Sequence, residues 1–407
     1  MTGGCPVHFD PFDPGFLADP RPVWAQLRSQ APVHYNPELD MWVVARHADI
    51  EAVFRDPATF SAGNAQDPAF PLHPEAQAVF AQGWVPLKTL SNADGEYHSR
   101  NRRYSLVGFT PRRLRALEPV IRRTATALID DIEAAGPGAD FVQGLAFPLP
   151  ATIIFTLLGF PPEDIDQLKA WANDRLSFSW GRPSPAEQAR TAADMVAYRA
   201  YCDAHVARRL AEPADDFTSD LLRYHRDDPE QLTLAEAAHI IFGFSFAGHE
   251  TTTNLLANAL HRCLGEPGVW DRLVADPAAI PGAVEEVLRF DSSVVAWRRI
   301  TTVETTIGGT AVPAGAKLLL LIGAANHDPA VFDEPERFDI TRADGHYLSF
   351  GWGKHYCLGA PLAKLELEVA LQELTRRFPG LRRADAAPLD YHPNLSFRGP
   401  RQLALTW

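Results

Sequence analysis

The sequence predicts a mainly α-helical protein with small β-sheets. Residues 115–223 carry several amphipathic stretches separated by Pro and Gly breaks, which is the pattern of consecutive packed helices. A capping-box signature, Thr233 with Glu236, opens a further long helix. Alternating segments at residues 32–44 and 305–322 are short and enclose turn residues, so we expect only small hairpins there.

Composition excludes some functions. The chain has 407 residues and a formal net charge of −13, so general nucleic-acid binding is not expected, because neutralising phosphates needs a basic surface. Four unevenly spaced cysteines give no disulfide framework, which fits a reducing compartment. Residues 1–8 lack a basic region followed by an apolar run, so we expect no signal peptide, no membrane anchor and a cytoplasmic location.

The first part of the chain predicts a helix, a hairpin and a second helix. Residues 19–24 have the composition of a helix start, residues 32–35 and 41–44 form the two arms of a hairpin, and residues 49–56 predict a short helix. Residues 63–90 mix Pro, Phe and Trp without clean periodicity, and we expect a loop-rich cover there.

Two basic residues are spaced to lie on one face of a helix. His98 and Arg102 are four residues apart within the basic run at residues 96–103. Cations at this spacing suit a ligand with two carboxylates, although a solvated basic face would look the same. Both interpretations stay open on these residues alone.

The helix that opens at Thr233 has an unusual middle, and we expect it to continue to about Gly265. Residues 240–248 are apolar, and residues 249–254 then turn abruptly polar. The apolar run is too short to cross a bilayer. Gly, an acid and threonines inside a buried helix are locally unfavourable, and such a conflict often marks a functional site. A solvent-facing polar patch is the alternative.

Residues 350–360 contain three glycines and one cysteine, Cys357, and run directly into a helical pattern. A thiolate is stable where backbone N–H groups and a helix N-terminus offset its charge, and this segment offers both. A lone cysteine is most often a small buried apolar residue. A zinc site would need a second Cys/His pair, and no dinucleotide or phosphate loop can be read here. A thiolate facing a flat cofactor remains, which indicates haem.

The segment resembles the cysteine-ligand loop of the cytochromes P450, F-G-x-G-x-H-x-C-x-G-x-x-x-A. Its fixed positions are filled by Phe350, Gly351, Gly353, His355, Cys357, Gly359 and Ala363. The resemblance implies the cytochrome P450 fold, a single large haem-binding domain over residues 1–407. It also implies haem b (heme b, iron protoporphyrin IX) as cofactor, with Cys357 as axial ligand and Phe350, His355 and Gly359 beside it.

The polar part of the long helix resembles the oxygen-binding motif of the same family, A/G-G-x-D/E-T. In that resemblance Ala247 borders the cofactor and leaves room for dioxygen, Glu250 relays protons, and Thr251 hydrogen-bonds the bound oxygen. Glu250 and Thr251 are therefore the catalytic candidates.

Basic residues of this chain match the family's positions for binding the haem propionates. His98 and Arg102 resemble the H-x-x-x-R of bacterial members. Arg298 falls where relatives place another propionate ligand, with Arg299 as the competing choice. The pair Glu286 and Arg289, a weak signal alone, resembles part of the family's structural triad. Arg337 would be its third member.

The resemblance also predicts a substrate pocket and a docking face. The pocket residues would be Gly243, Phe246, Ala247, Val294, Val295, Leu395 and Phe397, with residues 395–397 at the tip of a C-terminal hairpin. An exposed positive patch beside the cysteine loop would comprise Arg100, Arg103, Arg112, Arg113, Arg115, Lys354 and Lys364.

We therefore expect a haem-thiolate monooxygenase that inserts one oxygen atom from O2 into a small or medium apolar organic substrate. A ferredoxin or flavodoxin-type donor would supply the electrons. Residues 180–183, 296–299, 325–328 and 396–400 are similar to the haem part of P450s fused to a reductase, but no reductase motif follows here. A peroxide-driven peroxygenase and a non-catalytic haem sensor are the alternatives, and the acid–threonine pair argues against both.

Overall fold

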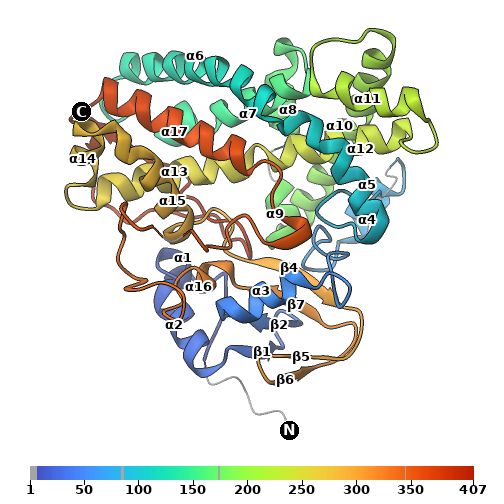
Figure 1. Cartoon of the computed structure of the whole chain (residues 1–407), viewed down its shortest axis with the longest axis horizontal. Coiled ribbons are helices and arrows are strands. Elements are labelled where there is room, and N and C mark those ends of the chain that lie inside the picture. The colour runs from blue at the N-terminus through green and yellow to red at the C-terminus, as the bar shows by residue number, and fades with distance from the viewer. Residues whose placement is uncertain (1–6, 84–86, 173–174, 344) are drawn as a thin grey trace.

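A computed structural model describes residues 7–83, 87–172, 175–343 and 345–407, and its helices dominate, as predicted. Figure 1 shows the helices filling the upper part of the molecule and the strands gathered below. The helices of the first half are α1 (Pro14–Ala18), α2 (Arg21–Gln30), α3 (His47–Arg55), α4 (Pro74–Phe80), α5 (Gly95–Ser105), α6 (Pro111–Ala135), α7 (Pro148–Leu158), α8 (Ile165–Ala172), α9 (Arg175–Trp180) and α10 (Pro185–Ala211). The later helices are α11 (Phe217–Asp227), α12 (Leu234–Ala247), α13 (Glu250–Gly265), α14 (Val269–Ala275), α15 (Ile280–Phe290), α16 (Ile322–Ala325) and α17 (Ala360–Arg377).

Most sequence-predicted elements are present. The helices expected near residues 19–24 and 49–56 are α2 and α3, and the pattern after the cysteine loop is α17. The capping box is formed, since the Thr233 hydroxyl accepts from the Glu236 N–H at 3.2 Å. Of the predicted loop-rich cover at residues 63–90, residues 84–86 lie outside the described residues. The segment before them is less irregular than predicted, because it contains α4, with proline in its first turn and His73 as its N-cap.

The main sheet has five strands in the order β1-β2-β7-β4-β3. They are β1 (Val33–Asn36), β2 (Met41–Val44), β7 (Lys317–Leu320), β4 (Trp297–Thr301) and β3 (Phe60–Ser61). The predicted N-terminal hairpin is β1 with β2, with Val33 opposite Val44. β2 pairs in parallel with β7, and the other pairs are antiparallel.

Two smaller sheets correct the sequence prediction in part. The turn at Gly308 and Gly309 joins β5 (Thr305–Ile307) to β6 (Thr310–Val312), whereas β7 belongs to the main sheet. β8 (Arg382–Arg383) pairs with β9 (Leu405–Thr406). The predicted terminal hairpin is a loop closed by a single bridge from Tyr391 to Pro400, with residues 395–397 at its tip.

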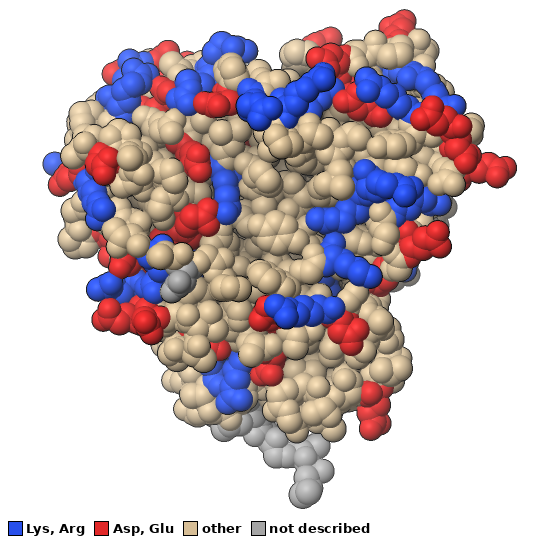
Figure 2. Space-filling view, in the orientation of Figure 1, with Lys and Arg blue, Asp and Glu red and all other residues tan. Residues whose placement is uncertain are grey.

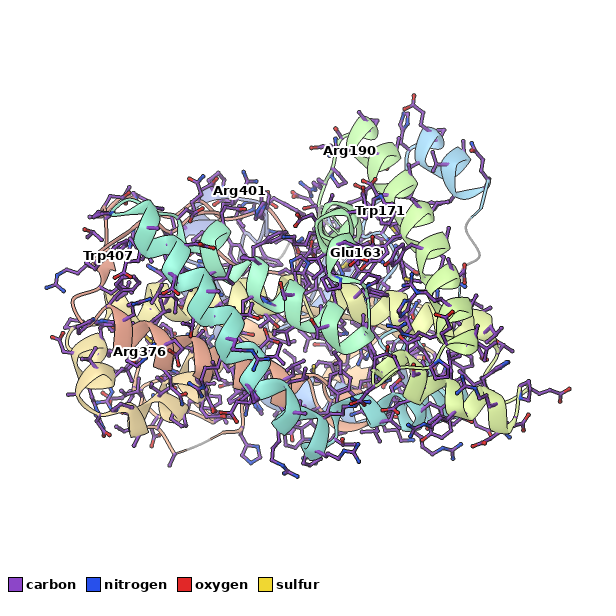
Figure 3. All side chains as sticks on the ribbon, turned by 90° about the horizontal axis from the view of Figure 1, so that it is seen from above. Glu163, Trp171, Arg190, Arg376, Arg401 and Trp407 are labelled. Atoms are coloured by element: carbon purple, nitrogen blue, oxygen red, sulfur yellow. The ribbon has the colours of Figure 1, made fainter. Side chains whose placement is uncertain are left out.

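The largest apolar core lies between the long helices, and α17 packs on α6 while α10 packs on α12. Figure 3, which looks down on these helices, places Trp407 and Arg376 at one end and Trp171 and Arg190 towards the other. Trp407 stacks on Phe378 with ring centroids 4.5 Å apart, which ties the C-terminus to the end of α17. None of the described helices has both the length and the apolar character needed to cross a membrane.

The predicted helix from Thr233 to about Gly265 is interrupted. α12 ends at Ala247 and α13 starts at Glu250, so the prediction of one continuous helix is wrong. Gly248 lies against α7 at this break, where a Cβ would come within 2.7 Å of the Ile154 side chain and a larger residue would not fit. The next residue, His249, is fully buried against the ring of Phe147, whose centroid lies 4.6 Å away. The polar run therefore starts at a kink held by neighbouring side chains.

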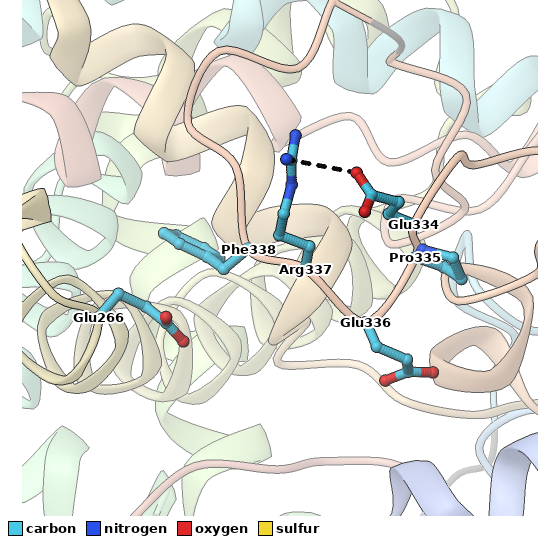
Figure 4. Close-up of a pocket in the computed structure, with 6 residues that line it drawn as sticks. All are labelled: Glu266, Glu334, Pro335, Glu336, Arg337 and Phe338. Atoms are coloured by element: carbon cyan, nitrogen blue, oxygen red, sulfur yellow. Dashed lines mark ion pairs between the residues drawn. The ribbon is translucent and has the colours of Figure 1, made fainter.

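Arg289 on α15 is held by a buried network, which corrects one member of the predicted triad. Its guanidinium donates two hydrogen bonds to Glu286, at 2.7 and 2.8 Å. The side chain of Arg337 instead points outward, pairs with Glu334 at 3.3 Å and with Asp339 at 2.6 Å, and is 60% exposed (Figure 4). Arg342 takes the expected place, with its Nε 3.2 Å from Glu286 Oε2.

The segment around Arg337 contributes its backbone to the network. The Pro335 carbonyl accepts from Arg289 Nη1 at 2.9 Å, and the Arg337 carbonyl accepts from Nη2 at 3.2 Å. The Asp339 N–H in turn donates to Glu286 at 2.8 Å. The segment therefore binds Arg289 and Glu286 through its own main-chain atoms, and the side chain of Arg337 faces the surface.

Stability is expected to fall in acid because several histidines are buried. Burial lowers the pKa of His249 to about 3, whereas an unfolded histidine titrates near 6.5. The unfolded state then takes up a proton that the folded state refuses, so stabilisation present above about pH 6.5 is lost as the pH falls towards 3. A His249→Gln variant should lower the slope of unfolding free energy against pH by up to about 1.4 kcal/mol per unit between pH 6 and 4. Urea titrations of both proteins give that slope, and equal slopes would refute the assignment.

Replacing Arg342 by Met should cost about 1–3 kcal/mol, because Glu286 stays buried and loses a charged partner. Replacing Arg337 by Met should cost less than about 1 kcal/mol, because its ion pairs are exposed. Denaturant unfolding of the two matched variants checks the order. A larger loss for the Arg337 variant would restore Arg337 as the triad member.

Candidate active site

The loop before α17 wraps the sulfur of Cys357. The Cys357 N–H donates to the Phe350 carbonyl at 2.9 Å, which closes the loop. Gly351 and Gly353 both have φ of +69°, a conformation that L side chains rarely adopt. A Cβ at Gly353 would also lie 3.0 Å from the Phe54 carbonyl oxygen of α3. The spacing of the glycines is therefore required by backbone geometry and by the close approach of α3.

The Cys357 thiol lies beside the N-terminus of α17. The backbone N–H groups of Gly359 and Ala360 hydrogen-bond the sulfur and act to lower the pKa of the thiol, as does Arg102. Burial has the larger effect and raises that pKa overall. The residue nevertheless keeps accessible surface. Protein atoms surround the Cys357 thiol, yet the residue still has accessible surface. The sulfur therefore faces a space inside the protein.

Basic side chains, those of His98 and Arg102 among them, gather on one side of the loop. The His98 ring on α5 lies 4.1 Å from the His355 ring, and Arg102 donates to the Tyr356 carbonyl at 2.7 Å. Burial, followed by the charge of Arg102, lowers the pKa of His98. The Nε2 atom of His98 is buried and has no hydrogen-bond partner among the described residues.

Asp94, which the sequence did not single out, positions this basic group. It precedes α5, accepts from the Ser61 hydroxyl at 2.5 Å and from the Ala62 N–H at 3.1 Å, and so ties α5 to β3. Its Oδ1 lies 3.6 Å from His355 Nε2. No sequence pattern links Asp94 to His355, which explains why it was missed.

The structure favours Arg299 over Arg298 as the third arginine of this group, which corrects the first choice. Arg298 lies over the Trp180 ring at 3.8 Å and donates to the carbonyls of Ala65, Asp67 and Ser179. Arg299 is also buried. Burial, followed by the charge of Arg299, lowers the pKa of His355. Successive residues of a strand point to opposite faces, so only one of the two arginines can face His355.

The kink between α12 and α13 presents small and polar residues to an internal space. Ala247 is exposed although its neighbours Phe246 and His249 are buried. Thr251, in the first turn of α13, donates its hydroxyl hydrogen to the Ala247 carbonyl at 2.8 Å. Gly243, one turn before Ala247, also keeps accessible surface. Glu250 is half-buried and precedes Thr251 at the start of α13.

Phe109 connects this face of α12 to the cysteine loop. Its ring lies 5.5 Å from the Phe244 ring of α12. A Cβ at Gly359 would lie 3.9 Å from both Phe109 Cε1 and Cys357 Sγ. The helix kink and the cysteine loop are therefore parts of one site, although more than a hundred residues separate them in the chain.

Four predicted pocket residues lie together. Val294 bridges to Phe397, the Val295 N–H donates to the Ser396 carbonyl at 2.7 Å, and the Leu395 N–H donates to the Trp180 carbonyl at 2.9 Å. Of the predicted residues on α12, Phe246 is largely buried, with its ring 5.0 Å from that of Tyr198 on α10. It therefore packs mainly in the core, while 7% of its surface stays accessible.

The predicted basic patch is smaller than expected. Arg100 pairs with Glu236, Arg113 with Asp220 and Lys364 with Glu285, each at 2.6 Å. The members that remain exposed are Arg103, Arg112, Arg115 and Lys354. Figure 2 shows basic side chains on the right-hand side of the face on which Figure 1 shows α5.

A surface hollow of about 550 Å³ lies elsewhere (Figure 4). It is lined by Glu266, Glu334, Pro335, Glu336, Arg337 and Phe338. None of these is a predicted catalytic, cofactor or pocket residue, and Arg337 was expected only in the structural triad. We therefore assign the chemistry to the cysteine loop and the helix kink.

The site residues fit a haem. Cys357 offers a soft ligand towards an internal space, while His98, Arg102 and Arg299 offer cationic donors for carboxylates beside it. The unpartnered Nε2 of His98 is a donor of the kind that a propionate would satisfy. The arrangement defines a haem-thiolate protein.

Comparison with known proteins agrees with this class. The family model for Cytochrome P450 matches residues 35–397. "Cytochrome P450 monooxygenase PikC" of Streptomyces venezuelae is 36% identical over 402 residues, covering 96% of this chain and 92% of that protein. The solved structure of "cytochrome P450 CREJ in complex with (4-ethylphenyl) dihydrogen phosphate" superimposes with a TM-score of 0.94 at 38% identity, covering 98% of this chain and 99% of the other.

An intact type IV self-sufficient cytochrome P450 monooxygenase also matches, with a TM-score of 0.95 and 37% identity over 98% of this chain and 53% of the other. The chain therefore belongs to the cytochrome P450 family. It has the P450 fold in a single domain, is an oxidoreductase of the monooxygenase class, and takes haem b with a cysteine thiolate as axial ligand.

A Cys357→His variant tests the ligand. Loss of the thiolate should abolish the red-shifted Soret band of the ferrous carbonyl complex, because that band needs a strongly donating sulfur opposite the carbonyl. Cys263→Ala, which removes a fully buried thiol in α13, is the matched control and should keep the band. An unchanged carbonyl spectrum in the Cys357 variant would contradict the assignment.

Proposed function

We propose that this protein inserts one oxygen atom from O2 into a small or medium organic substrate with a largely apolar body. The observation that carries the proposal is the pairing of Glu250 and Thr251 at the helix kink, on the accessible face that Phe109 connects to the cysteine loop. A haem carrier or sensor could use the thiolate as its ligand, but it would have no need for a proton-relay pair.

Cys357 would hold the cofactor through its thiolate, and His98, Arg102 and Arg299 would bind its carboxylates. A bound haem supplies the oxygen-binding metal and the one-electron chemistry that side chains lack. The hydroxyl hydrogen of Thr251 is committed to the Ala247 carbonyl, so its Oγ1 is left to accept a hydrogen bond from a proton donor in the pocket. Glu250, next to it, would take protons from the polar side of the kink.

The electrons would come from an acidic ferredoxin or flavodoxin-type protein. The exposed Arg103, Arg112, Arg115 and Lys354 lie beside the elements that hold the sulfur, and positive charge steers an acidic partner to this face. Arg102 links α5 to the loop through the Tyr356 carbonyl. Charges on α5 and on the loop therefore sit on one connected surface.

Replacing Thr251 by Ala should uncouple reductant use from product formation by roughly tenfold or more, because a positioned proton-transfer group contributes about 10²-fold or more. Turnover with ferredoxin, its reductase and NAD(P)H is measured as product formed per reductant consumed. Thr253→Ala is the control, because the Thr253 hydroxyl also bonds a carbonyl one turn back, that of His249, but is buried in the core.

Unchanged coupling in the Thr251 variant would reject the proton-delivery role. Product formation by the unaltered protein with hydrogen peroxide but not with any reduced donor would favour a peroxygenase. No oxygen consumption with either oxidant system and a full set of ligands would favour a sensor.

A further inference from the structure

Arg175, at the start of α9, places a guanidinium inside the protein. Burial lowers its pKa to about 10, with the charge of Glu250 opposing that effect. The side chain still keeps accessible surface. As for Cys357, protein atoms surround the Arg175 guanidinium while its side chain keeps accessible surface. The guanidinium therefore faces a space inside the protein rather than the outer surface.

Among the residues that the structure describes, Arg175 has fewer hydrogen-bond partners than its guanidinium has N–H donors. An arginine carries five N–H donors. Among the described residues, the hydrogen-bond partner of Arg175 is the Ser179 hydroxyl, which Nη1 contacts one turn further along α9. Donors of an enclosed cation that lack a protein partner must bind water or a ligand, and an anionic ligand satisfies them best.

A second buried arginine shares the same serine. Arg298 Nη2 contacts the Ser179 carbonyl at 3.4 Å, and its Nε has no hydrogen-bond partner among the described residues. Burial, together with the charge of Arg175, lowers the pKa of Arg298 to about 9, although Asp67 opposes this. Asp67 is exposed, so solvent screens its charge. The charge of Arg175 therefore acts on Arg298, and the charge of Glu250 acts on Arg175.

Aromatic rings border this group. The Arg175 guanidinium carbon lies 5.9 Å from the centre of the Phe246 ring on α12. Trp180, against which Arg298 stacks, lies 5.7 Å from the ring of Phe397, a predicted pocket residue. Cationic donors and apolar walls therefore occur together, as a ligand with one charged end and one apolar end requires.

We propose that Arg175, held by Ser179 and supported by Arg298, binds an anionic oxygen group of the substrate, either a carboxylate or a phosphate monoester, while the apolar body packs against Phe246. This inference rests on the proposed function, because it assigns the recognition end of the same pocket. It replaces a wholly apolar substrate by an apolar molecule that ends in an anion. Arg175 is then a binding and specificity residue.

Matched pairs of probes test the inference on the haem-loaded protein. The pairs are 4-propylbenzoate with 4-propylbenzamide, and 4-propylphenyl phosphate with 4-propylphenol. Dissociation constants come from the shift of the Soret band or from calorimetry. At least one anion should bind roughly tenfold or more tightly than its neutral partner, because charge-assisted bonds to arginine are strong in an enclosed site. If the benzoate binds more tightly than its neutral partner, the substrate carries a carboxylate. If the phenyl phosphate does, the substrate carries a phosphate.

Substitutions locate the effect. Arg175→Met keeps the apolar length and should remove the preference for the anion, while Arg175→Lys should keep part of it. Arg182→Met is the matched control, because Arg182 is exposed and lies over the Phe12 ring at 4.2 Å, and it should bind like the unaltered protein.

Two outcomes overturn the inference. Neutral probes that bind as tightly as both anions to the unaltered protein would reject an anion site without any variant being needed. A preference that survives Arg175→Met would place the anion elsewhere. If neutral probes are oxidised with reduced ferredoxin in either case, the proposed monooxygenase function stands while the anion site fails. Absence of any oxidation with intact probe binding would instead count against the proposed function.

Discussion

A thiolate inside a protein is stable only where enough N–H dipoles face it, and here those dipoles come from Gly359 and Ala360 at the start of α17. This requirement dictates the rest of the loop. The chain must turn sharply before the sulfur, so Gly351 and Gly353 take positive φ values, and Phe350 must return to accept the Cys357 N–H. α17 must in turn be fixed, and its packing against α6 in the main core achieves that.

The buried network around Arg289 also helps to fix the cysteine loop, because it holds the backbone that precedes the loop. Arg289 on α15 gathers the carbonyls of Asn326, Pro335 and Arg337 with one guanidinium. Asn326 then donates to the Ser349 hydroxyl at 2.8 Å and accepts from the Leu348 N–H at 2.7 Å. These hydrogen bonds hold the irregular backbone at Leu348 and Ser349, immediately before the cysteine loop. A charged side chain does this well because charge-assisted bonds hold several carbonyls at once.

The features that the sequence predicted best are those that depend on residues next to one another in the chain. The cysteine loop, the capping box at Thr233 and the N-terminal hairpin depend on local spacing and on backbone conformation, so they could be read directly. The close approach of Gly248 to Ile154 could not be read, because it depends on how α12 packs against another helix.

The direction in which a side chain points was the second feature that could not be predicted from the sequence. Arg298 and Arg299 differ only in the strand face that each occupies, and that face is set by the register with β7. Whether Arg337 or Arg342 reaches Glu286 depends on a loop whose path follows main-chain hydrogen bonds. Asp94 contacts His355 of the cysteine loop, and Arg175 lies near Phe246 of α12, and no motif marks either residue.

The parallel pairing of β2 with β7 sets Val43 beside Leu319. During synthesis the N-terminal hairpin must therefore wait for most of the polypeptide to leave the ribosome before its exposed edge is covered. Loop-closure entropy makes such distant pairing slow, and an uncovered edge invites association with other chains. High yields of folded protein should therefore depend on slow expression or on chaperones that shield the nascent N-terminal segment.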